Sequence, residues 1–330
     1  MSRFTTSRPR ALTAGAVLAV SAITLAGCVA DAPVEEDGTI AVVASTIVYG
    51  ELVSTLGGDT VTVTSLIESA AQDPHSFEAS ARDQLAVSEA ELVIVNGGGY
   101  DPFAEALYEA AGAGAVLVTA VDESGLIDDD DQADDDHAEE EADDDHSTDD
   151  GHDHIEGFNE HVWYSFTAMK QIAEHISDEL TALDPSASDK FDANLAAFLI
   201  ELGNLDSQAD QISELAADRG AAVTEPVPVY LLEAVGLRDV TPAEFTQAIE
   251  EGSDVPPTAL RNVLELIQSG KAALLAYNEQ TASPETERVR LTAVEENVAV
   301  VSFTETLPEG SDYVEWMSSN LDALAAALAE

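Results

Sequence analysis

The chain has 330 residues and a formal net charge of −53, because 65 acidic residues face only 12 Lys and Arg. This balance argues against nucleic acid as a partner, since phosphate binding needs a basic surface. It makes a cation the natural ligand. Apolar residues account for 45% of the chain, and the length suits two domains of ordinary size.

Residues 1–27 have the pattern of an export signal. A basic start precedes an uncharged run over 11–27, which is slightly short for a membrane-spanning helix of about 20 residues. Small residues then lead into Cys28, the only cysteine. This is the lipobox pattern of bacterial lipoproteins, so we predict an extracytoplasmic protein anchored to the cell membrane by lipid on Cys28. The alternative is an ordinary signal peptide with an incidental cysteine. The acidic segment 28–38 is predicted to be a tether.

From residue 39 onward, β-branched runs of strand length alternate with helical stretches, which predicts parallel α/β sheets. An N-terminal lobe is expected over 39–185. Its predicted strands are 39–44, 61–67, 92–96 and 116–121, and its predicted helices include 47–56, 80–89 and 102–111.

An insert interrupts this lobe at residues 128–154. It holds sixteen Asp or Glu and four histidines, which are His137, His146, His152 and His154. With almost no apolar residues it cannot bury enough surface to fold alone, so a disordered loop is predicted. Histidine beside carboxylate suits zinc, which favours a low-affinity metal collector. The alternative is a solvated charge run that only aids solubility.

A long helix is predicted over 186–218, where apolar residues recur at helical spacing. At about 1.5 Å per residue it approaches roughly 50 Å, enough to run along two domains. A C-terminal lobe over 219–330 follows. Its predicted strands are 221–224, 273–277 and 298–303, and its predicted helices are 228–236, 242–250, 257–269, 284–296 and 312–328. The predicted fold is therefore two α/β lobes with mainly parallel sheets, joined by one long rigid helix.

Four short segments near strand ends or helix starts carry candidate metal ligands, at the positions where open α/β sheets usually bind ligands. The candidate side chains are His75, His161, Glu225 and Glu305. Each signal is weak alone, because a lone histidine is more often structural and glutamates are common on surfaces. The residues themselves support only the hypothesis that one pair from each half converges in a cleft between the lobes.

Five segments, in order DPHSFEAS, ELVIVNGGGYD, NEHVWYSF, VTEPVPVYLLEAVGL and VSFTETLPEG, resemble the zinc/manganese solute-binding lipoproteins of bacterial ABC importers. The resemblance covers roughly residues 39–330. It implies a monomer with two α/β domains joined by a long helix and a metal between them. It also implies capture of zinc outside the cell, without catalysis, for delivery to a membrane permease.

Carried over by position, the resemblance assigns His75 and His161 to the family's two histidines. Glu225 falls where members have His or Glu, and Glu305 where they usually have Asp. Asn159 and Glu160 replace the more usual Asp-Pro before His161. Two histidines with two carboxylates also resemble manganese sites, whereas the histidine-bearing loop favours zinc, which is our first choice.

An outer hydrogen bond to these ligands is expected from Asn278 or Gln280, at the end of strand 273–277. Two rival functions stay open. A hydrolytic metalloenzyme needs an open metal position and a general base, and the sequence has no H-E-x-x-H pair. A surface adhesin would use its metal only structurally.

Overall fold

The β-branched runs of the first half form a four-stranded parallel sheet in the computed structural model, which describes residues 38–69, 72, 74–112, 114–127, 155, 157–216 and 219–329. The strands are β1 (Ile40–Thr46), β2 (Val61–Ile67), β3 (Leu92–Val95) and β4 (Val116–Thr119). Their order is β2-β1-β3-β4. All four residues of β3 are buried, as expected for a parallel strand covered on both faces.

The second half repeats the same strand order. Its sheet runs β6-β5-β7-β8 and is also parallel. The strands are β5 (Gly220–Val223), β6 (Arg238–Asp239), β7 (Ala272–Asn278) and β8 (Ala299–Phe303). The sequence did not reveal β6, because two exposed residues carry no periodic pattern. In both sheets the strand order reverses beside the first strand, and ligand sites usually form at such a reversal.

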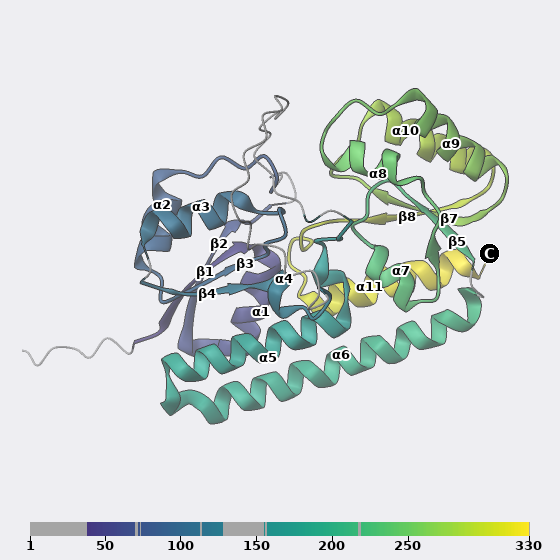
Figure 1. Cartoon of the computed structure of the whole chain (residues 1–330). Coiled ribbons are helices and arrows are strands. Elements are labelled where there is room, and N and C mark those ends of the chain that lie inside the picture. The colour runs from purple at the N-terminus through teal and green to yellow at the C-terminus, as the bar shows by residue number, and fades with distance from the viewer. Residues whose placement is uncertain are drawn as a thin grey trace, which may run out of the picture. The chain divides into compact units, whose positions relative to one another are not determined.

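Helices cover both faces of each sheet (Figure 1). The N-terminal lobe has α1 (Ile47–Gly57), α2 (Ala81–Glu89), α3 (Pro102–Ala111), α4 (Ala120–Glu123) and α5 (Phe166–Leu183). The C-terminal lobe has α7 (Val229–Ala234), α8 (Ala243–Glu250), α9 (Pro257–Gln268), α10 (Pro284–Glu295) and α11 (Tyr313–Leu328). Capping boxes fix two helix starts, at Ser80 before α2 and at Ser283 before α10.

One long helix, α6 (Ser188–Ala216), runs beneath both lobes (Figure 1). Its 29 residues extend about 44 Å at the usual rise, which confirms the predicted helix. The helix starts at Ser188, directly after a 3-10 turn at Pro185–Ala187. The side chain of Asp184 caps this turn by accepting a hydrogen bond from the N–H of Ser186.

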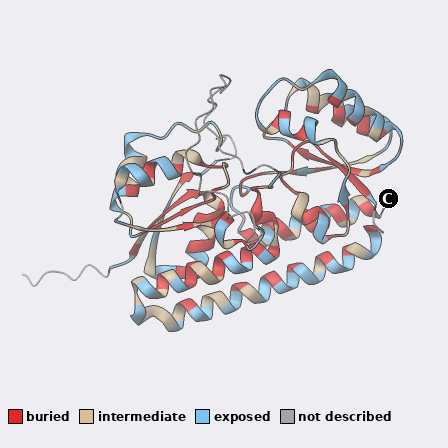
Figure 2. Ribbon diagram, in the orientation of Figure 1, coloured by how far each residue is buried: buried red, intermediate tan, exposed pale blue. Residues whose placement is uncertain are grey.

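The buried face of α6 belongs to one hydrophobic cluster that contains core residues of both sheets. Figure 2 shows this buried layer continuing from one lobe to the other. Smaller clusters lie under the outer helices of each lobe. Because interiors are close-packed and deform little, the shared core restricts movement of one lobe against the other.

Leu202 is a sensitive point of this shared core, since it lies on α6 and is only 3% exposed. We expect Leu202→Ala to lower the free energy of unfolding by about 2–5 kcal/mol, because it removes buried apolar atoms and leaves a cavity. Ile200→Ala, two residues away on the same helix and 65% exposed in the parent, is the matched control. Urea unfolding of both variants tests this, and equal destabilisation would contradict it.

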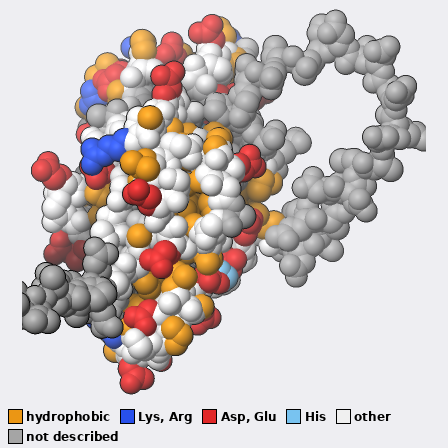
Figure 3. Space-filling view, turned by 90° about the vertical axis from the view of Figure 1, so that its left-hand side faces the viewer, with side chains coloured by type: hydrophobic (Ala, Val, Ile, Leu, Met, Phe, Trp, Pro, Cys, Tyr) orange, Lys and Arg blue, Asp and Glu red, His pale blue; other side chains and the backbone are white. Residues whose placement is uncertain are grey.

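Several predicted features lie outside the described residues: the lipidation residue Cys28 and the loop histidines His137, His146, His152 and His154. Within the described part of the chain, none of the helices combines the length and apolarity needed to cross a membrane. On the face drawn in Figure 3, acidic side chains are scattered over the surface and basic ones are few, in keeping with the composition.

Candidate metal centre

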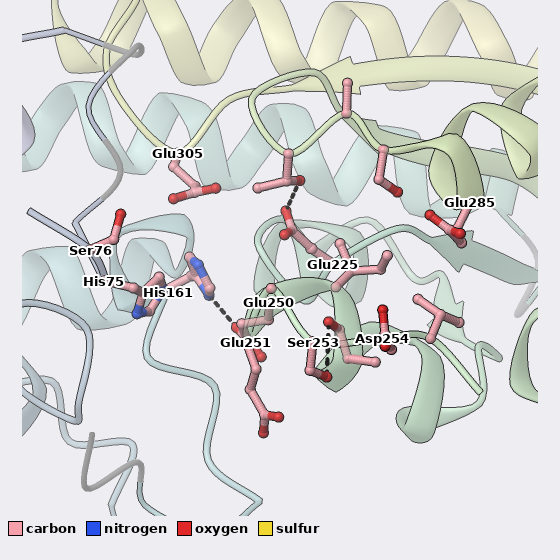
Figure 4. A pocket seen from close by; sticks show the side chains of 17 residues that line it. His75, Ser76, His161, Glu225, Glu250, Glu251, Ser253, Asp254, Glu285 and Glu305 are labelled. Carbon is pink, nitrogen blue, oxygen red and sulfur yellow. Dashed lines mark hydrogen bonds and ion pairs between the residues drawn. The ribbon is translucent and has the colours of Figure 1, made fainter. Parts of the chain in front are cut away.

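All four predicted ligand residues line a single cavity of about 1000 Å³ (Figure 4). His75 and His161 come from the N-terminal lobe, on the loop after β2 and just before a 3-10 turn at Val162–Tyr164. Glu225 and Glu305 come from the C-terminal lobe, two residues after β5 and β8. The fold therefore places one pair from each half at the same cavity. Their role as metal ligands stays a prediction.

The two glutamates share one hydrogen-bond donor, the side-chain amide of Asn278 at the end of β7. Its Nδ2 donates to Glu305 Oε1 at 2.6 Å and to Glu225 Oε2. The hydroxyl of Thr281 also donates to Glu225 Oε2, at 2.7 Å. Both carboxylates are nearly buried, at 3% and 6% exposed, so these donors replace water that burial has removed. The amide fixes the spacing of the two acids.

Gln280 has a different role from Asn278. Its side-chain Oε1 accepts a hydrogen bond from the backbone N–H of Glu305 at 2.6 Å. The neighbouring carbonyl of Thr304 accepts one from the Tyr164 hydroxyl, also at 2.6 Å. The peptide group between Thr304 and Glu305 is therefore held at both its carbonyl and its N–H. Of the two outer residues suggested by the sequence, Asn278 contacts the carboxylates and Gln280 positions the backbone.

His161 is 1% exposed and has a defined ring orientation. Its Nδ1 lies 2.8 Å from Oδ1 of Asn159. Because an amide oxygen only accepts, Nδ1 carries a proton, and in the neutral form of the ring the lone pair then lies on Nε2. The ring packs edge-on against Trp163, with centroids 5.2 Å apart. This apolar contact limits the access of water to the His161 ring.

A glycine turn after β3 places Tyr100 between the two histidines. Gly97, Gly98 and Gly99 all have positive φ, which glycine adopts without strain. Tyr100 follows directly, fully buried, with its ring centroid 5.1 Å from that of His75 and 5.6 Å from that of His161. No pattern in the sequence indicates that Tyr100 reaches the site.

The cavity is strongly acidic. The described residues that line it include no Lys or Arg but six acids, which are Glu225, Glu250, Glu251, Asp254, Glu285 and Glu305. Burial, together with the charges of Glu160, Glu225 and Glu305, raises the pKa of Glu250 to about 9. A divalent cation relieves this repulsion, and imidazole with carboxylate is a donor set that zinc and manganese accept.

Glu250 is one of the cavity residues that the sequence analysis did not identify. It ends α8, and its Oε1 lies 3.9 Å from Nδ1 of His161. Glu160, His161 and Glu250 together have ligand atoms within 4.8 Å of one another, a spacing suited to an ion. No local signal marks Glu250, because an acidic pair at a helix end is a common solvated feature.

The chain is similar in sequence to proteins that bind or transport metal ions. A family model described as ZnuA, the periplasmic component A of a zinc-uptake complex, matches residues 42–327. The zinc-binding lipoprotein AdcA of Streptococcus pneumoniae is 27% identical over 302 residues, which cover 88% of this chain but only 56% of AdcA. The manganese ABC transporter substrate-binding lipoprotein PsaA of Streptococcus mitis is 23% identical, with coverage of 95% and 97%.

The fold has counterparts among solved structures. The periplasmic zinc-binding protein TroA from Treponema pallidum superposes with a TM-score of 0.67 at 18% identity, covering 89% of this chain and all of TroA. Two parallel α/β lobes on a long helix are thus a shared architecture. Since the family model spans nearly the whole of the described fold, the chain belongs to the ZnuA family of zinc-uptake component A proteins.

Proposed function

We propose that this chain captures a zinc ion outside the cell and delivers it to the membrane permease of an ABC importer. It binds the ion with His75, His161, Glu225 and Glu305 and does not change it chemically. It acts as a monomer held at the cell membrane by lipid on Cys28. The acidic loop over 128–154 collects metal with low affinity.

One observation carries the proposal: two histidines and two glutamates from opposite lobes line one acidic cavity. The relatives support a metal cargo, since AdcA is a zinc-binding lipoprotein and PsaA a manganese ABC transporter substrate-binding lipoprotein. This chain spans about half the length of AdcA, so its cargo and partner are argued from its own site.

Manganese is the second candidate, and the donor set favours it specifically. Two carboxylates beside two imidazoles supply more oxygen than a site with three histidines, and manganese prefers oxygen donors and higher coordination. Zinc accepts the same four groups in tetrahedral geometry. The nearby carboxylate of Glu250 adds to the oxygen-rich character.

Thermal unfolding of the metal-free protein with zinc and manganese side by side tests the cargo. A ligand that binds only the folded state adds about 2.7 kcal/mol at a free concentration 100 times its Kd. We expect zinc to raise the Tm at lower concentration than manganese, and magnesium in excess to have no comparable effect. Elemental analysis of the purified protein should then find about one zinc per chain. Absence of any shift with either metal would contradict metal capture.

The rival functions give different results. A hydrolytic metalloenzyme would turn over generic ester or peptide substrates when loaded with metal, and we expect no turnover above that of free metal. An adhesin that uses its metal structurally would retain it tightly, whereas a delivery protein has to release it to a permease. We therefore expect the bound ion to exchange with isotopically labelled zinc without unfolding of the protein.

A further inference from the structure

Asn159 makes hydrogen bonds to both lobes with one side chain. Its Oδ1 accepts from two groups of His161, the ring Nδ1 at 2.8 Å and the backbone N–H at 3.1 Å. Its Nδ2 donates to the carbonyl of Pro226 at 3.0 Å. Pro226 directly follows Glu225 in the C-terminal lobe. A half-buried amide thus connects the segments that carry a histidine and a glutamate of the cavity.

The orientation of this amide follows from its partners. The Pro226 carbonyl only accepts hydrogen bonds, so the NH2 group has to face it. The backbone N–H of His161 only donates, so Oδ1 has to face that group. A flipped amide would place like groups against each other on both sides. The same Oδ1 then requires a proton on Nδ1 of His161, so the neutral form of this ring has its lone pair on Nε2.

A second bond joins the same two segments. The hydroxyl of Tyr230, on α7 of the C-terminal lobe, donates to the backbone carbonyl of Asn159 at 2.8 Å. Asn159 is therefore held from the opposite lobe at its backbone and at its side chain. No hydrophobic side chain of similar size at position 159 could make any of the three hydrogen bonds of the Asn159 side chain.

We propose that Asn159 is a positioning residue that prepares the cavity for its ion. It holds His161 in the tautomer with the proton on Nδ1, and it fixes the segment of Glu225 relative to that ring. Asn159 does not itself contact the ion. The inference rests on the proposed function for the identity of the ion, but its structural part, the tautomer of His161, is independent of it.

The physical benefit is preorganisation. Metal-binding histidines donate their second ring N–H to an outer partner, which sets the ring orientation, and loss of such a partner typically costs about 10–100-fold in affinity. Here the outer partner also connects the two lobes. Its loss should therefore disturb the tautomer of His161 and the spacing between His161 and Glu225 together.

Zinc titration calorimetry and 15N NMR of the histidine rings test the proposal on the full chain. We expect Asn159→Ala to weaken zinc binding by about 10–100-fold and to give His161 a mixture of tautomers in the metal-free protein. Asn159→Asp, which is isosteric and keeps the acceptor, should restore the Nδ1–H tautomer. Tyr230→Phe removes only the backbone bond, so it should keep the tautomer and weaken zinc binding less than Asn159→Ala.

Asn194→Ala is the matched control. Its amide donates to the Leu56 carbonyl at 2.8 Å, and Asn194 does not line the metal cavity, so neither zinc affinity nor the tautomer should change. The proposal is overturned if Asn159→Ala binds zinc within twofold of the parent and keeps a single Nδ1–H tautomer. If Asn159→Ala does not fold, parent-like zinc affinity in Tyr230→Phe overturns the connection between lobes. A parent protein that binds no zinc would refute the proposed function, while the tautomer comparison would still decide the role of Asn159.

Discussion

Zinc affinity is expected to fall by more than about 100-fold when His161 is replaced by alanine, beyond the loss that removal of an outer partner causes. The ring orientation of His161 is set by its hydrogen bond to Asn159, and the residue is nearly fully buried in the cavity wall. Its removal takes away one nitrogen donor and leaves a space that water can fill. A 100-fold loss corresponds to about 2.8 kcal/mol of binding free energy.

His175→Ala is the control for this prediction. His175 lies on α5, about one-third exposed, and its ring contacts only the surface carboxylates of Glu123 and Glu179 among the ion pairs of the described residues. His175→Ala is therefore the same histidine-to-alanine substitution, made at a position away from the cavity. Titration calorimetry should give a zinc affinity for His161→Ala more than about 100-fold lower than that for His175→Ala. Equal zinc affinity in the two variants would mean that His161 is not a ligand.

Asn278→Ala is expected to weaken zinc binding by about 10–100-fold although Asn278 is not a predicted ligand. One amide nitrogen holds the carboxylates of Glu225 and Glu305. Without it, two nearly buried acids lose a shared donor and repel each other, so they no longer converge at the spacing the ion needs. The effect should appear as lower zinc affinity in calorimetry at constant pH.

Thr281→Val provides a graded comparison. It removes a single hydrogen bond, to Glu225 alone, and keeps the size of the side chain. We expect a smaller loss of zinc affinity than in Asn278→Ala. If Thr281→Val were the more damaging change, the shared donor would not be the main determinant of the site. An affinity in Asn278→Ala equal to that of the parent would lead to the same conclusion.

The shared core restricts how an ion can enter the cavity. The hydrophobic cluster along α6 contains core residues of both lobes, and bonds such as that of Asn159 to Pro226 connect the lobes at the cavity. A wide hinge opening would break these contacts. Entry is therefore expected through local movement at the cavity rim, where the segment after α8 carries Glu251 and Asp254.

Sequence by itself determined the secondary structure of this chain to a large extent. Strands β1, β2, β7 and β8 lie within two residues of their predicted bounds, because β-branched runs between helical stretches leave few alternatives. The long helix was visible from its apolar spacing. Each of the four candidate ligands was recognisable from its position beside a strand end or a helix start.

Only the tertiary structure decided that these four residues share a cavity. His75 and Glu305 are separated by more than two hundred residues, and no local pattern encodes such a distance. Parallel strands bring their carboxyl ends to one edge within each sheet, but the packing on α6 sets one edge against the other. The same packing places Glu250 beside His161 and lets Asn159 reach Pro226. These two contacts join residues of both lobes, so they exist only once the shared core has formed. The contacts of Asn278 with Glu225 and Glu305 form within the C-terminal lobe, but they too need strands that are far apart in the sequence to pair in one sheet.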